Sequence, residues 1–420
     1  MPETHIIGAG LAGLACAVAL ARTGRRSVLH EAARQAGGRC RSFHDETLDR
    51  VIDNGNHLML SGNWAAMDYL ATIGARDTLL SPAQARIPFL DLETGERWTV
   101  RPNAGPIGWW VFAPSRRVPG SCAGDYLQAL RLARADKSAT VADCFDTSRP
   151  LYRRLWEPLA VAALNTAADE GAARLLWPVV RETVLKGEAY RRPCIARDGL
   201  SDSLVTPALD YLQAQGSEIR FNARARSLVF AGGRAAAIEI GQDTLDLAPA
   251  DAVVVAVPPA AAQTLIPDCP GPTASRAIVN AHFRLNAPID APADMADAPL
   301  LGLIGGVAQW LFLRGEIASV TISAAEAHVD TPAETLAPRI WADVARALNR
   351  PDAPMPPVRI VKEKRATFAQ TPESLDLRPG TPTSYRNLFL AGDWTDTGLP
   401  ATIEGAVRSG FRAAEAVLAL

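Results

Sequence analysis

The sequence predicts an α/β fold, and three observations lead to that prediction. A β-α-β unit opens the chain around a glycine-rich turn at 8–13. Two short apolar segments, at 253–257 and 387–391, have the continuous hydrophobic pattern of parallel strands that are buried on both faces. The third observation is size, because 420 residues, 48% of them hydrophobic and 21% charged, suffice for two or three domains. This composition excludes a disordered chain.

Charge and cysteine usage exclude further classes of protein. The chain has 43 Lys and Arg residues against 45 Asp and Glu residues, a formal net charge of −2, so we expect no nucleic-acid partner. The six cysteines form no CxxC pair and the six histidines no HExxH spacing, so we expect neither a disulfide framework nor a metal site. Since we find no basic leader and no uncharged apolar window of about 18 residues, we expect no signal peptide and no membrane span.

The N-terminal unit can be divided into three elements. A β-prone run at 4–7 is followed by a helix over 14–22, which ends before Gly24, a residue suited to the left-handed position after a helix. A second strand over 27–30 leads into Glu31. This arrangement predicts a unit in which the turn between strand and helix faces a ligand.

The turn itself has the GxGxxG spacing of a dinucleotide-binding, Rossmann-like fold. Gly8 permits the tight turn, Gly10 lets the backbone approach a pyrophosphate, and Gly13 allows close packing of helix on strand. The free N–H groups at the start of the helix favour a negatively charged ligand. Glu31, 18 positions after Gly13, is placed to accept hydrogen bonds from ribose hydroxyls.

The rest of the chain predicts mixed structure that ends in a helix. An alternating strand lies at 218–222, and segments 226–230 and 236–240 form a hairpin around the Gly232-Gly233 pair. The chain closes with a helix over 404–418 that is rich in small residues.

Two segments indicate which dinucleotide is bound. Glu31 is followed by the pair Gly37-Gly38 and by Arg39, and the strand at 387–391 leads into Gly392-Asp393. Together with the glycine-rich turn, these segments resemble the cofactor-binding segments of the FAD-dependent amine oxidase and phytoene desaturase superfamily. The resemblance implies an FAD cofactor, with Arg39 at the pyrophosphate, Asp393 at the ribityl chain and the last helix at the pyrimidine ring. The residues that it assigns to FAD are Gly8, Gly10, Leu11, Ala12, Gly13, Glu31, Ala32, Gly38, Arg39, Asn54, Gly55, Asn56, Ala225, Gly392, Asp393, Thr402 and Ile403.

The resemblance covers nearly the whole chain and implies a two-lobed flavoprotein. The Rossmann-like FAD-binding lobe is expected from residues 1–75, 196–258 and 381–420, arranged around a largely parallel sheet. The substrate lobe, with a mixed sheet plus helices, is expected from residues 76–195 and 259–380.

Four further segments, at 53–63, 116–120, 155–166 and 392–404, resemble one bacterial branch of this superfamily. That branch is the squalene-associated FAD-dependent desaturases, or hydroxysqualene dehydroxylases, of hopanoid biosynthesis. The resemblance implies that reduced flavin converts hydroxysqualene, a C30 isoprenoid, to squalene and water. Since the chain has a single GxGxxG, we expect an external electron donor.

Cleavage of the C–O bond needs a proton donor, and His57 is the first candidate. The resemblance places the segment Asn54 to His57 beside flavin N5, and an unperturbed histidine pKa suits proton donation near neutral pH. The alternative is a structural histidine. Asp396 and Glu404 are weaker candidates, and the favoured alternative is that both cap the last helix.

A cluster of aromatic and basic residues suits a membrane interface. Trp109, Trp110 and Phe112 precede Arg116 and Arg117, and such rings and cations meet at the headgroups of anionic lipids. The alternative is a packed loop of the substrate lobe. We expect a cytoplasmic protein with peripheral contact to the inner face of the membrane.

Three rival functions remain open. An oxidative desaturase of carotenoid precursors would use the same flavin site, with hydride flowing in the opposite direction. An amine oxidase would need two aromatic rings in front of the flavin, of which Trp394 supplies one. A prenyl-lipid carrier, like the GDP-dissociation inhibitors of the same architecture, would not need Glu31, Arg39 and Asp393.

Overall fold

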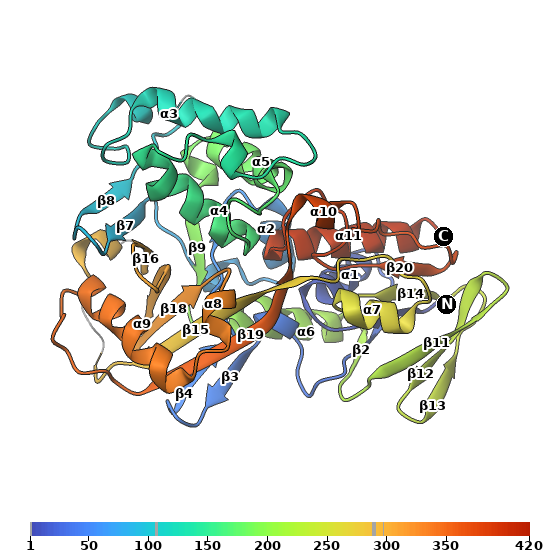
Figure 1. The fold of residues 1–420 in the computed structure, drawn as a ribbon. Coiled ribbons are helices and arrows are strands. Elements are labelled where there is room, and N and C mark those ends of the chain that lie inside the picture. Colours follow the sequence, from blue (N-terminus) through green and yellow to red (C-terminus); the bar gives the residue numbers. More distant parts are fainter. Residues whose placement is uncertain (1, 106–107, 288–290, 297) are drawn as a thin grey trace.

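A five-stranded parallel sheet lies near both chain termini in the computed structural model (Figure 1), which describes residues 2–105, 108–287, 291–296 and 298–420. The order of its strands is β10-β2-β1-β14-β20, so strands from distant parts of the chain lie side by side. Four of the five strands are buried along their whole length, as the apolar pattern predicts. The strands are β1 (Thr4–Ile7), β2 (Ser27–His30), β10 (Glu218–Arg220), β14 (Ala252–Val255) and β20 (Leu388–Leu390).

Two helices pack closely against each other beside this sheet. They are α1 (Leu11–Arg22) and α11 (Ile403–Leu418). A Cβ atom on Gly410 would lie only 2.3 Å from the carbonyl oxygen of Ala12, so this contact requires glycine. Gly24, at φ +77°, ends the first helix as predicted.

The first helix begins three residues earlier than predicted. Residues 11–13, assigned from the sequence to the turn, already form the first turn of α1. The strand predicted at 253–257 also ends early, at Val255, because the chain leaves the sheet at Ala256 and passes against Gly8.

A seven-stranded mixed sheet forms the second lobe, with the order β19-β15-β18-β17-β16-β7-β8. The long helix α9 (Ala333–Ala347) packs on one face, where Val279 and Phe283 join its apolar core. Asn280 and His282 alternate with these residues and point to the opposite face. The strands are β7 (Ile87–Asp91), β8 (Arg97–Val100), β15 (Ser275–Arg284), β16 (Leu300–Ile304), β17 (Trp310–Arg314), β18 (Ile317–Ile322) and β19 (Val358–Phe368).

Short helices cover the end of the second lobe that lies at the top of Figure 1. They are α3 (Ala123–Leu127), α4 (Glu157–Leu164), α5 (Ala173–Glu182) and a 3-10 helix over Gln128–Arg134. Among the described residues, no helix is long and apolar enough to pass through a bilayer.

The remaining elements are short. The predicted hairpin is confirmed, and Gly232 and Gly233 turn it with φ angles of +58° and +73°, as a tight hairpin turn requires. The predicted two-lobed α/β fold is likewise confirmed. The other helices and strands are α2 (Trp64–Thr72), α6 (Thr206–Ala214), α7 (Pro259–Leu265), α8 (Glu326–Val329), α10 (Pro372–Leu375), β3 (Ser42–Asp45), β4 (Arg50–Asp53), β5 (Met59–Leu60), β6 (Leu79–Leu80), β9 (Pro193–Ala196), β11 (Ala225–Ala231), β12 (Arg234–Ile240) and β13 (Asp243–Asp246).

Candidate cofactor and active site

The three glycines of the N-terminal turn differ in what requires them. A Cβ atom on Gly8 would lie 2.5 Å from the carbonyl oxygen of Ala256, and one on Gly13 would lie 2.0 Å from the carbonyl oxygen of Gly8. A Cβ atom on Gly10 would meet no protein atom within 4 Å, and its φ of −74° suits any residue. Packing therefore explains the first and third glycines. The space in front of the second, at the N-terminus of α1, fits a bound phosphate group.

The segment with paired glycines lies against this turn. The Gly37 N–H donates to the carbonyl oxygen of Ala9 over 2.8 Å, and a Cβ atom on Gly38 would lie 3.4 Å from the Cα atom of Gly10. Arg39 follows directly. The structure thus brings the first two cofactor segments of the sequence together.

Glu31 lies at the carboxyl end of β2. One carboxylate oxygen accepts a 2.8 Å hydrogen bond from the Ala9 N–H, and the other accepts one of the same length from the Ala33 N–H. The Glu31 carbonyl oxygen accepts from the Ala223 N–H, which places Ala32 and the start of β11 at Ala225 near the same end of the sheet. This is the end of a parallel sheet at which dinucleotides bind.

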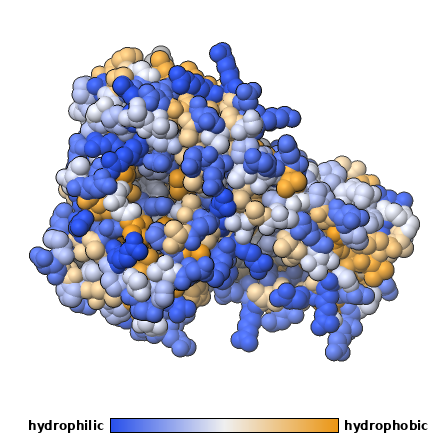
Figure 2. Space-filling model, viewed as in Figure 1, coloured by the Kyte–Doolittle hydropathy of each residue, from blue (hydrophilic) through white to orange (hydrophobic). Residues whose placement is uncertain are grey.

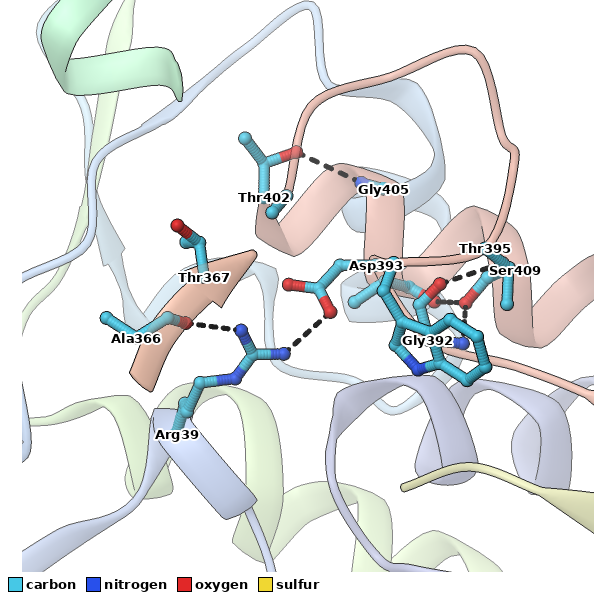
Figure 3. Close-up of polar contacts among 12 residues, drawn as sticks. Arg39, Ala366, Thr367, Gly392, Asp393, Thr395, Thr402, Gly405 and Ser409 are labelled. Carbon is cyan, nitrogen blue, oxygen red and sulfur yellow. Dashed lines mark hydrogen bonds and ion pairs between the residues drawn. The ribbon is translucent and has the colours of Figure 1, made fainter. Parts of the chain in front are cut away.

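Arg39 and Asp393 meet although 354 positions separate them (Figure 3). The Arg39 Nη2 donates to the Asp393 Oδ1 over 2.7 Å, and Nη1 donates to the carbonyl oxygen of Ala366 over 2.6 Å. The carboxylate raises the pKa of Arg39 further. Of the Arg39 side-chain surface, 40% is accessible, so this side chain is free to meet a ligand.

A buried arginine that the sequence analysis missed holds the loop of Asp393. The Arg378 guanidinium donates to the backbone carbonyl oxygens of Asp393, Trp394 and Thr395 and lies over the Phe368 ring. Burial lowers its pKa to about 10. No local motif marks this residue, because its partners are backbone atoms of another segment.

The N-terminus of α11 lies near Asp393 (Figure 3). The hydroxyl oxygen of Thr402 accepts from the Gly405 N–H over 3.1 Å and so caps the helix, while Ile403 is its first residue. The favoured alternative for Glu404 is wrong, because its carboxylate instead accepts from the N–H groups of Ala65 and Ala66 at the start of α2. Glu404 therefore joins two helices, for which a carboxylate at a helix N-terminus is well suited.

Asp396 does not enter the site. It is exposed, and its carboxylate accepts from the Gly398 N–H within its own turn, so it does not cap α11 either. Trp394 is also excluded from an aromatic pair. Its ring is buried at 1% exposure, and its Nε1 donates to the Val257 carbonyl oxygen on the core side of the loop.

The segment Asn54 to Asn56 is held against the second lobe. Asn280 Nδ2 donates to the Asn54 carbonyl oxygen, Thr321 Oγ1 donates to Asn280 Oδ1, and Asn56 Nδ2 donates to Thr321 Oγ1. A Cβ atom on Gly55 would lie 2.9 Å from Asn280 Nδ2, so the approach needs glycine. Among the described residues, the buried Asn56 Oδ1 has no partner. The alternation of polar and apolar residues along 279–283 is the signal that could have identified Asn280.

His57 follows this segment, with Nε2 4.0 Å from the sulfur of Cys40. Burial lowers the His57 pKa from 6.5 to about 4. The expectation of an ordinary pKa is therefore wrong, and the ring is neutral at pH 7. A neutral imidazole retains one N–H donor, so a hydrogen-bonding role stays a prediction.

Gln370 forms hydrogen bonds to two of the segments that resemble the bacterial branch, 155–166 and 392–404. Its Oε1 accepts from the Ala401 N–H over 2.8 Å, beside the start of α11. Its backbone N–H donates to Thr166 Oγ1, and its side-chain amide reaches the Leu164 carbonyl oxygen. Gln370 is fully buried, so these segments depend on one another for their positions.

Comparisons with known proteins agree with this geometry. The family described as flavin containing amine oxidoreductase matches residues 11–289 and 305–418. Hydroxysqualene dehydroxylase of Rhodopseudomonas palustris is 50% identical over 416 residues, which are 99% of this chain and 98% of that protein. The protein of the same name from Sinorhizobium fredii is 46% identical, over 100% of this chain and 99% of its own. The fold is similar to that of cyclohexylamine oxidase from Brevibacterium oxydans, with a TM-score of 0.72, 15% identity and coverage of 99% and 98%.

Proposed function

Because the chain belongs to the family of flavin-containing amine oxidoreductases, we propose that it is an FAD-dependent hydroxysqualene dehydroxylase, which removes the allylic hydroxyl group of hydroxysqualene to give squalene. The observation that carries the proposal is 44–50% identity, over the whole chain, to three proteins of that name. The predicted flavin cofactor is confirmed by the family.

The residues present fit FAD. The opening in front of Gly10 would take the pyrophosphate, Glu31 the ribose, and the paired Arg39 and Asp393 the pyrophosphate and ribityl regions. The N–H groups at the start of α11, behind Thr402, would face negative charge on the pyrimidine ring. When bound and reduced, the flavin supplies a hydride from N5.

The overall reaction needs a hydride and a proton, and it releases water. The C–O bond breaks, the departing hydroxyl oxygen takes up the proton to form water, and the hydride takes the place of the hydroxyl group on carbon. The protein has to bind an apolar C30 chain, supply the proton and keep out bulk water, which would otherwise capture an allylic cation.

His57 is the group that we assign to the hydroxyl. The neutral His57 ring has an N–H to donate. Because the pKa of His57 is low, the ring is not an imidazolium ion at neutral pH. The proton that the leaving hydroxyl takes up therefore comes from another hydrogen-bonded donor or from water. Asp396 is not part of this proposal.

Two further parts of the proposal concern partners and place. An external electron donor reduces the flavin, since the sequence carries one GxGxxG turn. The protein works in the cytoplasm, where its lipid substrate requires access to the membrane. The amine-oxidase alternative loses support because Trp394 is buried.

The test is an anaerobic single-turnover experiment. The purified flavoprotein is reduced with dithionite and mixed with hydroxysqualene, while visible flavin absorption is followed and the lipid is extracted. We expect reoxidation that is matched by squalene. A flavin that stays reduced, with hydroxysqualene recovered intact, would contradict the proposal. Reaction of the oxidised enzyme with carotenoid precursors would then support the desaturase alternative.

A further inference from the structure

Four large apolar side chains are exposed on neighbouring short helices of the second lobe. Trp109 and Phe112 have 49% and 72% of their surface exposed, and Leu127 and Leu130 have 66% and 49%. The 3-10 helix Trp109–Phe112 contacts α3, and Leu130 lies on the 3-10 helix that continues from α3. We call these four residues the apolar patch. Clustered exposure of this kind marks interaction sites more often than chance.

Trp110 fixes the orientation of this patch. Its ring is buried at 4% exposure, lies edge-on to Tyr126 with centroids 5.1 Å apart, and has the Arg191 guanidinium 5.9 Å away. The expectation that Trp110 itself meets a membrane is therefore wrong. Because Trp110 anchors the 3-10 helix from below, Trp109 and Phe112 are turned outward.

Arginines lie beside the apolar patch, and an exposed acid, Asp146, also lies near it, with its backbone N–H donating to Gln128. Arg131 and Arg134 are exposed beside Leu130, and the Arg116 guanidinium lies 5.0 Å from the centroid of the Trp109 ring. Between residues 101 and 137 the only acids are Asp125, which is buried and paired with Arg149, and Asp136. The cations in the same stretch are Arg101, Arg116, Arg117, Arg131, Arg134 and Lys137.

We propose that the apolar patch and its basic border dock on an anionic lipid surface. Peripheral proteins bind to bilayers by burying aromatic rings at the depth of the headgroups and by electrostatic attraction between arginines and anionic lipids. A second copy of this chain is a poorer occupant, because a two-fold interface would bring the same basic borders together. Figure 2 shows apolar side chains among charged ones along the upper edge of the molecule, over α3.

The apolar core beneath the patch leads toward the proposed site. Trp110 belongs to the same hydrophobic cluster as Leu164 and Ile195, and Leu58, the neighbour of His57, packs against that cluster. The docking face therefore lies on the lobe expected to receive the isoprenoid.

Vesicle flotation tests the proposal with the flavin-loaded protein and without substrate. The vesicles contain either phosphatidylcholine alone or equal parts of phosphatidylcholine and phosphatidylglycerol. We expect binding to the anionic vesicles that weakens as salt rises. The variant Trp109→Ser/Phe112→Ser should lose at least about tenfold in partitioning. Arg131→Gln/Arg134→Gln should lose about 30-fold, from about 1 kcal/mol for each arginine.

The matched control removes two exposed arginines elsewhere. Arg339→Gln/Arg350→Gln changes charge equally on and after α9, away from α3 (Figure 1), and should partition like the wild type. Flavin content and melting temperature establish that each variant is folded.

Three results would overturn the proposal. They are equal binding to both kinds of vesicle, an apolar-patch variant that floats as well as the wild type, and a control that loses as much as Arg131→Gln/Arg134→Gln. A wild-type dimer that becomes monomeric in Trp109→Ser/Phe112→Ser, without vesicle binding, would assign the patch to a second copy instead. Since no turnover is measured, these outcomes are independent of the proposed reaction.

Discussion

Replacing Gly10 by alanine should separate flavin binding from folding. In the structure, the added Cβ atom would meet no protein atom within 4 Å, and a φ of −74° is allowed for alanine. The same change at Gly13 would place Cβ 2.0 Å from the Gly8 carbonyl oxygen. The two substitutions are chemically identical and lie in one turn, so each serves as the control for the other.

The expected magnitudes follow from these surroundings. For Gly10→Ala, the reduced freedom of the unfolded chain stabilises the protein by about 0.4–1 kcal/mol, and alanine at a helix N-cap costs a similar amount. The melting temperature of the flavin-free protein should therefore shift by at most about 3 °C. A phosphate oxygen bonded to the helix N–H groups would lie about 2.9 Å from nitrogen, a space that the methyl group would enter. We expect FAD affinity to fall at least tenfold, or about 1.4 kcal/mol.

The assay is FAD titration by fluorescence quenching, together with thermal unfolding of the flavin-free proteins. Gly13→Ala should fail to fold or should melt far below the wild type. If Gly10→Ala binds FAD within about twofold of the wild type, the pyrophosphate does not lie at this turn. If Gly10→Ala unfolds the flavin-free protein, the argument from open space is wrong.

Three more substitutions test other parts of the site. Asp393→Asn should weaken FAD binding about tenfold, measured by the same titration. The flavin-free protein should lose no more than about 1 kcal/mol of unfolding free energy, because the ion pair with Arg39 is partly exposed. Unchanged FAD affinity would show that Asp393 does not contact the cofactor. His57→Gln should slow turnover and flatten the pH dependence of stability. The pKa of His57 is about 4 in the folded protein and about 6.5 in the unfolded chain, so the unfolded state binds more protons between these pH values. The wild type therefore loses about 2 to 3 kcal/mol of unfolding free energy as the pH falls from 6.5 to 4. Parallel pH profiles from urea unfolding would show that burial does not control this histidine. Arg378→Met leaves backbone carbonyl oxygens unpaired and should cost about 2–4 kcal/mol of unfolding free energy. The control variant Arg365→Met changes an exposed position of β19 and should alter the unfolding free energy by no more than about 0.5 kcal/mol. Equal losses in the two variants would refute the role of Arg378.

Local patterns predicted the elements that depend on local physics. The strands at Thr4–Ile7 and Ser27–His30 and the helix stop at Gly24 follow from apolar runs and glycine geometry, which neighbouring residues determine. The sequence does not locate the start of α1, because the spacing of a glycine motif does not reveal where helical hydrogen bonding begins. The resemblance assigns Arg39 and Asp393 to one cofactor, but their direct contact is seen only in the structure, since no local pattern joins residues so far apart.

Side-chain roles that depend on distant partners could not be predicted in the same way. The position of Glu404 in the sequence predicts a cap for α11, but α11 packs on α2, and the Glu404 carboxylate accepts from N–H groups at the start of α2. His57 looked like a titrating acid, but burial lowers its pKa. Arg378 and Gln370 bond to backbone atoms of remote segments, and sequence spacing carries no signal for such contacts.

The Arg39–Asp393 pair can form only after nearly the whole chain has been synthesised. The N-terminal β-α-β unit and Arg39 leave the ribosome early, whereas Asp393, β20 and α11 are among the last segments synthesised. Domains that close early can fold during synthesis, but here the sheet edge at β14 and the surface of α1 wait for the end of the chain. The flavin site is therefore incomplete until these segments are made, and a ribosome that stops before residue 393 releases a chain that lacks Asp393 and the N-terminus of α11.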